Sequence, residues 1–294
     1  MNSINLSFGF YSEMPYGKLA ETNVGKEARI KELDITSRIN HLFDSFKASR
    51  TYFMLGDFLE KSKAHVGEES LKEIYNVENP LIEVSQHTQT HVIFRAISRR
   101  NDKKAVSHDE FIDDVIKANE TIRKVLNTTP KGLGTPLGYH HDMSDVPKLV
   151  KRLKEIGIGY ISSDLRNEQT TEGILTAQRQ PHKYKNINIP DVVEIPSHGF
   201  QDTIFIPYKA KAYGVSVLSK TEIIEHYLTL FNQAKEISYG SGDIFIALCL
   251  HPWAISQYDP NLEVLKNIIT TSMDKKINIL SYNEIADKVR TKCA

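Results

Sequence analysis

Two histidines follow a short apolar segment at a spacing that suits a metal ion. His87 and His91 come directly after the apolar run 81–85, with three polar residues between them. If that run is a strand, both imidazoles stand at its carboxyl end, where each can offer a neutral nitrogen to one divalent ion. The carboxyl ends of strands are also where α/β enzymes hold their reacting groups. The spacing therefore predicts a metal site at one edge of a sheet.

A third histidine, His251, ends a second predicted strand, 243–250, so all three imidazoles are expected in one pocket. Two histidines and one carboxylate are a common zinc ligand set, and Glu13, behind the run 4–10, is the preferred third ligand. Such an ion lowers the pKa of a bound water toward ~7 and polarises an amide or ester carbonyl. Glu13 is expected to act as ligand or base, and His251 would protonate the departing amine.

Other polar and aromatic residues follow further predicted strands and are expected at the same rim as substrate contacts. They are Tyr139, His140, His198, Asp202 and Trp253. Imidazole titrates near neutral pH, so His140, His141 or His198 could also replace a ligand or act as a base. Asp202 could instead orient a histidine. Trp253 could pack against a sugar ring or belong to the core.

The elements that must position these residues alternate between strands and helices. Apolar or alternating runs predict strands at 4–10, 51–55, 81–85, 132–136, 158–162, 192–196, 244–250 and 277–280. Helical patterns lie at 36–47, 108–126, 146–156, 220–237, 262–273 and 283–290, with capping boxes at Ser107 and Ser219. The stretch 168–191 is predicted to be a long connection. This order predicts an α/β fold with a parallel sheet, closed into a barrel of seven or eight units.

Composition restricts the class of protein. The chain has 294 residues with 37 basic and 37 acidic side chains, so no bulk field attracts nucleic acid. We expect one domain, 1–294, with no membrane span and no signal peptide. Cys249 and Cys293 provide neither a disulfide framework nor a thiolate metal site, and a cytoplasmic location fits. The oligomeric state is left open.

The order of the motifs resembles the polysaccharide deacetylase family, also called the NodB-homology or carbohydrate esterase family 4 group. Residues 87–91 are similar to its H-S/T-x-x-H metal motif, and 51–56 to its T-x-F-x-x-G strand. Residues 133–139 resemble its R-x-P-x-G motif, and 250–252 its last motif, whose histidine is the general acid. The resemblance runs from about residue 4 to about residue 282 and implies a distorted (β/α) barrel.

The sequence departs from the family at two motifs. Its first strand normally ends in T-F-D-D, which supplies the base and a metal ligand, but Gly9 and Phe10 stand there. Glu13 lies a few residues later, as in relatives that cleave cyclic amides such as allantoin. Gly134 replaces the arginine that would orient the base. These departures suggest rewired or lost chemistry.

The resemblance implies a metal-dependent hydrolase, with zinc as the first choice of metal. Its expected reaction removes an acyl group, N-acetyl first, from an amino-sugar unit in surface-polysaccharide or lipopolysaccharide biosynthesis. The substrate would be a small, nucleotide-linked or lipid-linked sugar. Two alternatives remain: a C-N hydrolase of cyclic amides, perhaps without a metal, and an inactive sugar-binding relative suggested by Gly9, Phe10 and Gly134.

Overall fold

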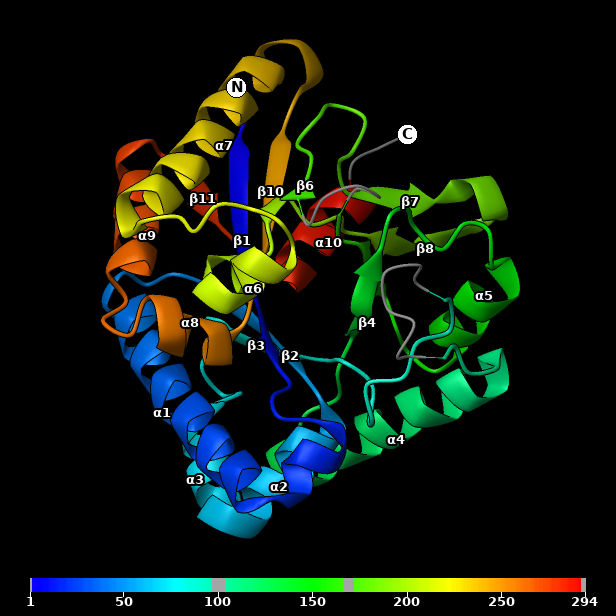
Figure 1. Cartoon of the computed structure of the whole chain (residues 1–294). Coiled ribbons are helices and arrows are strands. Elements are labelled where there is room, and N and C mark those ends of the chain that lie inside the picture. Colours follow the sequence, from blue (N-terminus) through cyan, green and yellow to red (C-terminus); the bar gives the residue numbers. More distant parts are fainter. Residues whose placement is uncertain (1, 97–103, 167–171, 292–294) are drawn as a thin grey trace.

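The computed structural model describes residues 2–96, 104–166 and 172–291 (Figure 1). Its main sheet has the strand order β10-β1-β2-β3-β4-β5-β8-β7, with β11 also paired to β1. The strands of this sheet are β1 Ile4–Ser12, β2 Arg50–Met54, β3 Ile82–Gln86, β4 Gly132–Tyr139, β5 Tyr160–Asp164, β7 His182–Tyr184, β8 Ile189–Glu194, β10 Ile244–Leu250 and β11 Asn278–Ile279. Strands β6 Glu172–Gly173 and β9 Gly199–Phe200 form a separate antiparallel pair. All pairings in the main sheet are parallel except that of β7 with β8.

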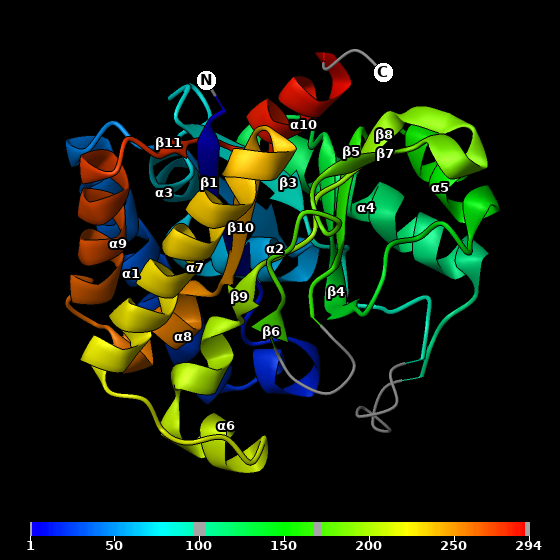
Figure 2. The same cartoon turned by 90° about the horizontal axis from the view of Figure 1, so that it is seen from above.

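Helices flank the sheet. The α-helices are α1 Asn23–Ser45, α2 Gly56–Val66, α3 Glu68–Ile74, α4 His108–Leu126, α5 Pro147–Glu155, α6 Pro207–Ala212, α7 Lys220–Ser241, α8 Pro252–Tyr258, α9 Glu263–Asp274 and α10 Tyr282–Thr291. Short 3-10 helices span Gly17–Glu21, Lys185–Ile187 and Asp202–Phe205. Helices α1, α7 and α9 lie on one flank and α4 and α5 on the other (Figures 1 and 2). None of the described helices is long and apolar enough to cross a membrane.

The alternation of side chains along β1 decides which residues face the site. Phe8 and Phe10 point outward and contact Phe43 of α1, with ring centroids 4.9 and 5.5 Å apart. Because successive side chains in a strand point to opposite faces, Tyr11 and Glu13 point inward. Tyr11 belongs to an aromatic cluster inside the sheet, and Glu13 lines the pocket above it.

The chain after β8 joins the two sides of the curled sheet. The backbone N–H of Ile195 donates to Ile161 O (2.8 Å), and that of Ser197 to Asp164 O (2.9 Å), so the segment still pairs with the β5 side. His198 then donates its backbone N–H to Ala247 O of β10 (2.7 Å). A hydrogen-bonded path therefore connects β5 with β10 on the side away from β1.

The predicted α/β fold is confirmed, and each predicted strand overlaps an observed one. Helix α4 has the predicted bounds, and capping boxes are present at Ser107 and Ser219. The predicted start of the first helix at residue 36 was wrong, because α1 begins at Asn23. Helices α2, α3, α6 and α8 were not predicted, and the presumed connection 168–191 contains β6 and β7. Residues 167–171 and Cys293 lie outside the described parts.

Candidate metal centre and active site

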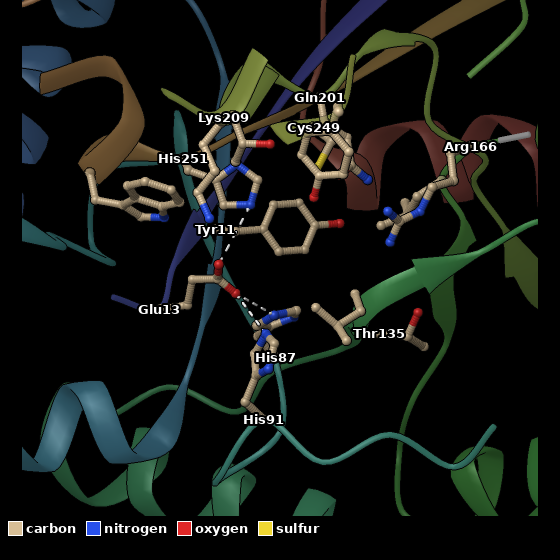
Figure 3. A pocket seen from close by; sticks show the side chains of 15 residues that line it. Tyr11, Glu13, His87, His91, Thr135, Arg166, Gln201, Lys209, Cys249 and His251 are labelled. Carbon is tan, nitrogen blue, oxygen red and sulfur yellow. Dashed lines mark hydrogen bonds and ion pairs between the residues drawn. The ribbon is translucent and has the colours of Figure 1, made fainter. Parts of the chain in front are cut away.

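Glu13, His87 and His91 meet at the carboxyl ends of β1 and β3 (Figure 3). The Oε2 atom of Glu13 lies 2.9 Å from His87 Nε2 and 2.9 Å from His91 Nε2. All three side chains are buried. Their ligand atoms lie within 4.8 Å of one another, and no second group of this kind occurs among the described residues. One carboxylate oxygen and two imidazole nitrogens fit the donor set of a zinc site with an open position.

The loop after β3 is held in place by side chains around it. Thr88 and His91 have positive φ angles, +65° and +62°, which other contacts must stabilise. The carboxylate of Asp114, on α4, accepts the backbone N–H groups of Gln89 (2.7 Å) and Thr90 (3.0 Å). His91 donates its own N–H to Thr88 Oγ1 at 3.1 Å. These hydrogen bonds fix the conformation of the loop that carries the two histidines, which favours a preformed metal site.

Backbone and aromatic contacts orient the two rings. His87 Nδ1 lies 2.7 Å from Gly134 O, and a carbonyl can only accept, so Nδ1 carries the proton. Nε2 is then the nitrogen that points toward Glu13 and that would be offered to an ion bound between the two side chains. The ring of His91 stacks on Tyr16, with centroids 4.3 Å apart.

The imidazoles also set the charge of Glu13. Burial by itself would raise the pKa of this carboxyl, but His91, His87 and His251 together hold it well below its usual range. Glu13 is therefore an anion at neutral pH, the form that binds a cation.

His251 faces the same carboxylate from β10. Its Nε2 lies 3.7 Å from Glu13 Oε1, while its Nδ1 lies 2.7 Å from Asp202 Oδ1. Asp202 also accepts the backbone N–H of His251 at 2.8 Å. Burial lowers the pKa of His251, but the negative charge and hydrogen bond of Asp202 outweigh it, and the pKa lies above its usual value. Asp202 thus fixes the ring so that Nε2 points into the pocket.

Of the other residues predicted at the rim, some line the pocket and some lie away from it. Trp253 lines the pocket, with its ring centroid 5.8 Å from that of His251. His198 is buried, accepts the N–H of Ala247 on Nδ1 (3.1 Å), and has its Nε2 2.9 Å from Arg179 O. Tyr139 packs beneath the guanidinium of Arg95 at 4.8 Å from the ring centroid. Neither these two nor His140 is among the residues lining the pocket, so their substrate contact stays a prediction.

Sequence reasoning missed much of the pocket wall. The unforeseen lining residues include Tyr11, Thr135, Arg166, Lys209 and Tyr213. Arg166 could have been found, because it lies two residues after the end of β5, at the same sheet edge as the histidines. Lys209 lies on α6, a short helix with no clear apolar periodicity.

Comparison with known proteins relates part of the chain to one family. A model of the polysaccharide deacetylase family matches residues 31–160, which include His87 and His91. The matched part of the chain is therefore similar to the polysaccharide deacetylase family. No curated protein matched the chain in a sequence search.

Solved structures show the same fold at low sequence identity. A Mycobacterium smegmatis protein described as a polysaccharide deacetylase is 17% identical, with a TM-score of 0.68 over 99% of this chain and 91% of that one. The Puue allantoinase is 14% identical, with a TM-score of 0.69 and the same coverage. A CE4 family pseudoenzyme from Bacillus anthracis is 15% identical, with a TM-score of 0.52 over 98% of this chain and 66% of that one. At these identities the similarities show the fold alone.

Proposed function

We propose that this protein is a metal-dependent hydrolase that removes an acyl group, in the first place N-acetyl, from an amino-sugar unit. The observation that carries the proposal is the position of Glu13, whose carboxylate faces both His87 and His91 at 2.9 Å. Glu13 thereby supplies the charge that Gly9 and Phe10 cannot provide. The expected setting remains surface-polysaccharide biosynthesis in the cytoplasm, on a nucleotide-linked or lipid-linked sugar.

Glu13, His87 and His91 would hold the ion, with zinc preferred for this mixture of nitrogen and oxygen donors. When bound, such an ion polarises the amide carbonyl and acidifies a water molecule. Glu13 contacts both imidazoles through Oε2, so its Oε1, on the side of His251, is the atom that can accept a proton from the attacking water.

His251 and Tyr11 are two proton donors that line the pocket. Asp202 holds His251 Nδ1, so protonated His251 directs its Nε2–H toward the pocket and can protonate the departing amine. Burial raises the pKa of the Tyr11 phenol well above its usual value. Tyr11 therefore stays protonated at neutral pH and can donate a hydrogen bond to the substrate.

The first prediction is that the purified protein retains about one divalent ion per chain after zinc supplementation and dialysis. His87→Ala, His91→Ala and Glu13→Gln should each lower both the metal content and the hydrolysis of N-acetylated amino sugars, because each removes one ligand. Elemental analysis measures the metal, and His41→Ala on the exposed face of α1 is the matched control. Substoichiometric metal that is indifferent to these substitutions would contradict the proposal.

Two alternatives keep specific support. The carboxylate at Glu13 rather than at residue 9 or 10 favours a C-N hydrolase of cyclic amides, which a hydantoin-type ring would test against N-acetylated sugars. Gly9, Phe10 and Gly134 favour an inactive sugar-binding relative. Binding of N-acetylated sugars without turnover of any amide, in metal-loaded protein, would support that second alternative.

A further inference from the structure

Glu32 lies on α1, which flanks the sheet, and its side chain is fully buried. Its Oε2 atom accepts the backbone N–H of Met14 at 3.3 Å. Burial and the nearby charge of Glu13 raise the pKa of the Glu32 carboxyl well above its usual value, whereas hydrogen bonds from the N–H groups of Met14 and Glu13 lower it. The carboxyl of Glu32 therefore faces the backbone of the segment that carries the candidate metal ligand Glu13.

These hydrogen bonds meet the chain at the point where the pairing of β1 ends. The last residue of β1 in register with β2 is Ser12, which lies opposite Met54. Beyond Ser12 this ladder no longer holds the backbone, so contacts from other elements are needed to fix residues 13 and 14. The site is sensitive to their position, because a metal ligand must be held within about 0.5 Å of its working geometry.

The stability of the fold does not by itself explain a carboxyl at residue 32. Its second oxygen, Oε1, is buried and has no hydrogen-bond partner among the described residues. The free energy lost by burying an unpaired oxygen is at least as large as that gained from a typical hydrogen bond, and the bond to Met14 is longer than usual. An apolar residue such as the neighbouring Leu33 would avoid this loss, but it could not accept the N–H groups at residues 13 and 14.

We propose that Glu32 is a positioning residue for the metal centre: its carboxyl holds the backbone at Glu13 and Met14, and thereby holds the Glu13 carboxylate beside His87 and His91. This inference rests on the proposed function, in which Glu13 is a metal ligand. Glu32 does not line the pocket, so it acts through Glu13 and not on the substrate. Residues that support a ligand in this way affect metal affinity although they never touch the metal.

Calorimetric titration of the metal-depleted protein with Zn²⁺ tests the inference. In Glu32→Leu, which removes the acceptor, zinc affinity should fall about 10- to 100-fold, as is typical when a residue that orients a metal ligand is lost. Glu32→Gln keeps an oxygen that can accept the N–H of Met14, so it should bind zinc nearly as tightly as the wild type. Thr36→Val is the matched control and should leave zinc affinity unchanged. Thr36 is buried on the same helix, but its hydroxyl donates to the helix carbonyl of Glu32 at 2.7 Å.

Urea unfolding of the metal-depleted variants separates positioning from stability. Glu32→Leu should unfold at no lower urea concentration than the wild type, since it buries no unpaired oxygen. A parallel drop of stability and zinc affinity would overturn the inference, because the weaker binding would then follow from a loosened fold. If Glu32→Leu does not fold, Glu32→Met, which also lacks an acceptor oxygen and adapts to irregular space, replaces it in every measurement.

The imidazole NMR signals of His87 and His91 give a readout that needs no zinc. Both rings lie 2.9 Å from the Glu13 carboxylate, so their chemical shifts should change in Glu32→Leu and stay close to those of the wild type in Glu32→Gln. Unchanged signals in Glu32→Leu would overturn the inference, as would wild-type zinc affinity in that variant or an equal loss of affinity in Glu32→Gln. A wild-type protein that bound no zinc would instead remove the proposed function, and the histidine signals would still decide whether Glu32 positions Glu13.

Discussion

Glu13 reaches the metal centre because of its place in the alternation of β1. Tyr11 and Glu13 share the inward face, whereas Phe10 packs against Phe43 on the outer face. Gly9 also faces inward but lies deeper, where an added Cβ would come within 2.9 Å of Tyr282 Oη. A carboxylate at residue 13 therefore reaches His87 and His91 from the same face of the strand.

The residue-scale prediction concerns the pair formed by His251 and Asp202. Asp202→Asn keeps the size of the side chain but removes the charge beside His251 Nδ1, and turnover of an N-acetylated sugar should fall about 10- to 100-fold. His251→Ala should lower kcat about 10²-fold or more. Because the two residues act as a unit, the double variant should be little slower than His251→Ala.

Steady-state kinetics, combined with analysis of the metal content, measures the losses of turnover in the two single variants and in the double variant. The losses should appear in kcat rather than KM, with the metal content unchanged in all three variants. Multiplicative losses in the double variant would show that Asp202 acts independently of His251.

At the scale of elements, His198 holds the junction between the chain after β8 and strand β10. Its backbone N–H donates to Ala247 O, and its Nδ1 accepts the N–H of the same residue. An accepting Nδ1 carries no proton, so the junction needs neutral imidazole. Burial, assisted by the nearby charge of Arg179, lowers the pKa of His198 to about 3.

The junction should therefore weaken in acid. Below about pH 6.5 the unfolded chain protonates this histidine while the folded protein does not, so the unfolded state binds more protons and stability falls as pH falls. The stability that neutral His198 contributes to the folded protein is fully present above about pH 6.5 and is lost progressively toward pH 3. At pH 5 this single group should cost about 2 kcal/mol of unfolding free energy.

Urea unfolding at pH 7 and pH 5 measures the effect. His198→Asn replaces Nδ1 with an amide oxygen that can accept the N–H of Ala247 without titrating. The variant should lose about 2 kcal/mol less than the wild type between the two pH values. The exposed His41→Asn is the control, and equal losses in the wild type and in His198→Asn would contradict this role.

At the scale of the whole molecule, the sequence predicted what depends on local pattern. The run 244–250 is apolar throughout because β10 is buried at every position, so its bounds were predicted correctly. The first half of α1 was missed because its buried residues include Arg29 and Glu32. Arg29 bonds to Ala20 O, and Glu32 accepts the N–H of Met14. Such pairings are set by tertiary contacts that periodicity does not register.

In the candidate site, too, local pattern predicted some residues, and tertiary packing alone places the others. Glu13, His87, His91 and His251 lie at strand ends, so the order of strands was enough to bring them together. Lys209 enters from α6, and its place at the pocket depends on how the chain packs after β9. No local signal in 207–213 carries that information.

The centre of the molecule shows what fills the space beside Gly134, where the motif that 133–139 resemble has an arginine. Tyr11 and Phe53 stack inside the curled sheet with ring centroids 4.7 Å apart, and the edge of Phe53 meets Tyr282 at 4.9 Å. A Cβ on Gly134 would lie 2.7 Å from Tyr11 Cε1 and 2.9 Å from Phe53 Cδ1. The aromatic rings thus occupy the space into which a side chain at residue 134 would extend.

The last prediction follows from this packing. Gly134→Ala should lower the free energy of unfolding by about 1–3 kcal/mol, because even a methyl group must displace two buried rings. Gly240→Ala is the matched control: its Cβ meets nothing within 4 Å, and alanine favours the helix, so this change should be neutral or stabilising. In a Phe53→Leu background the cost of Gly134→Ala should fall, since leucine leaves room beside Tyr11, and a double-mutant cycle from urea unfolding measures that coupling. If Gly134→Ala were as harmless as Gly240→Ala, the interior would have space for a larger side chain, and the aromatic rings would not explain the absence of the arginine.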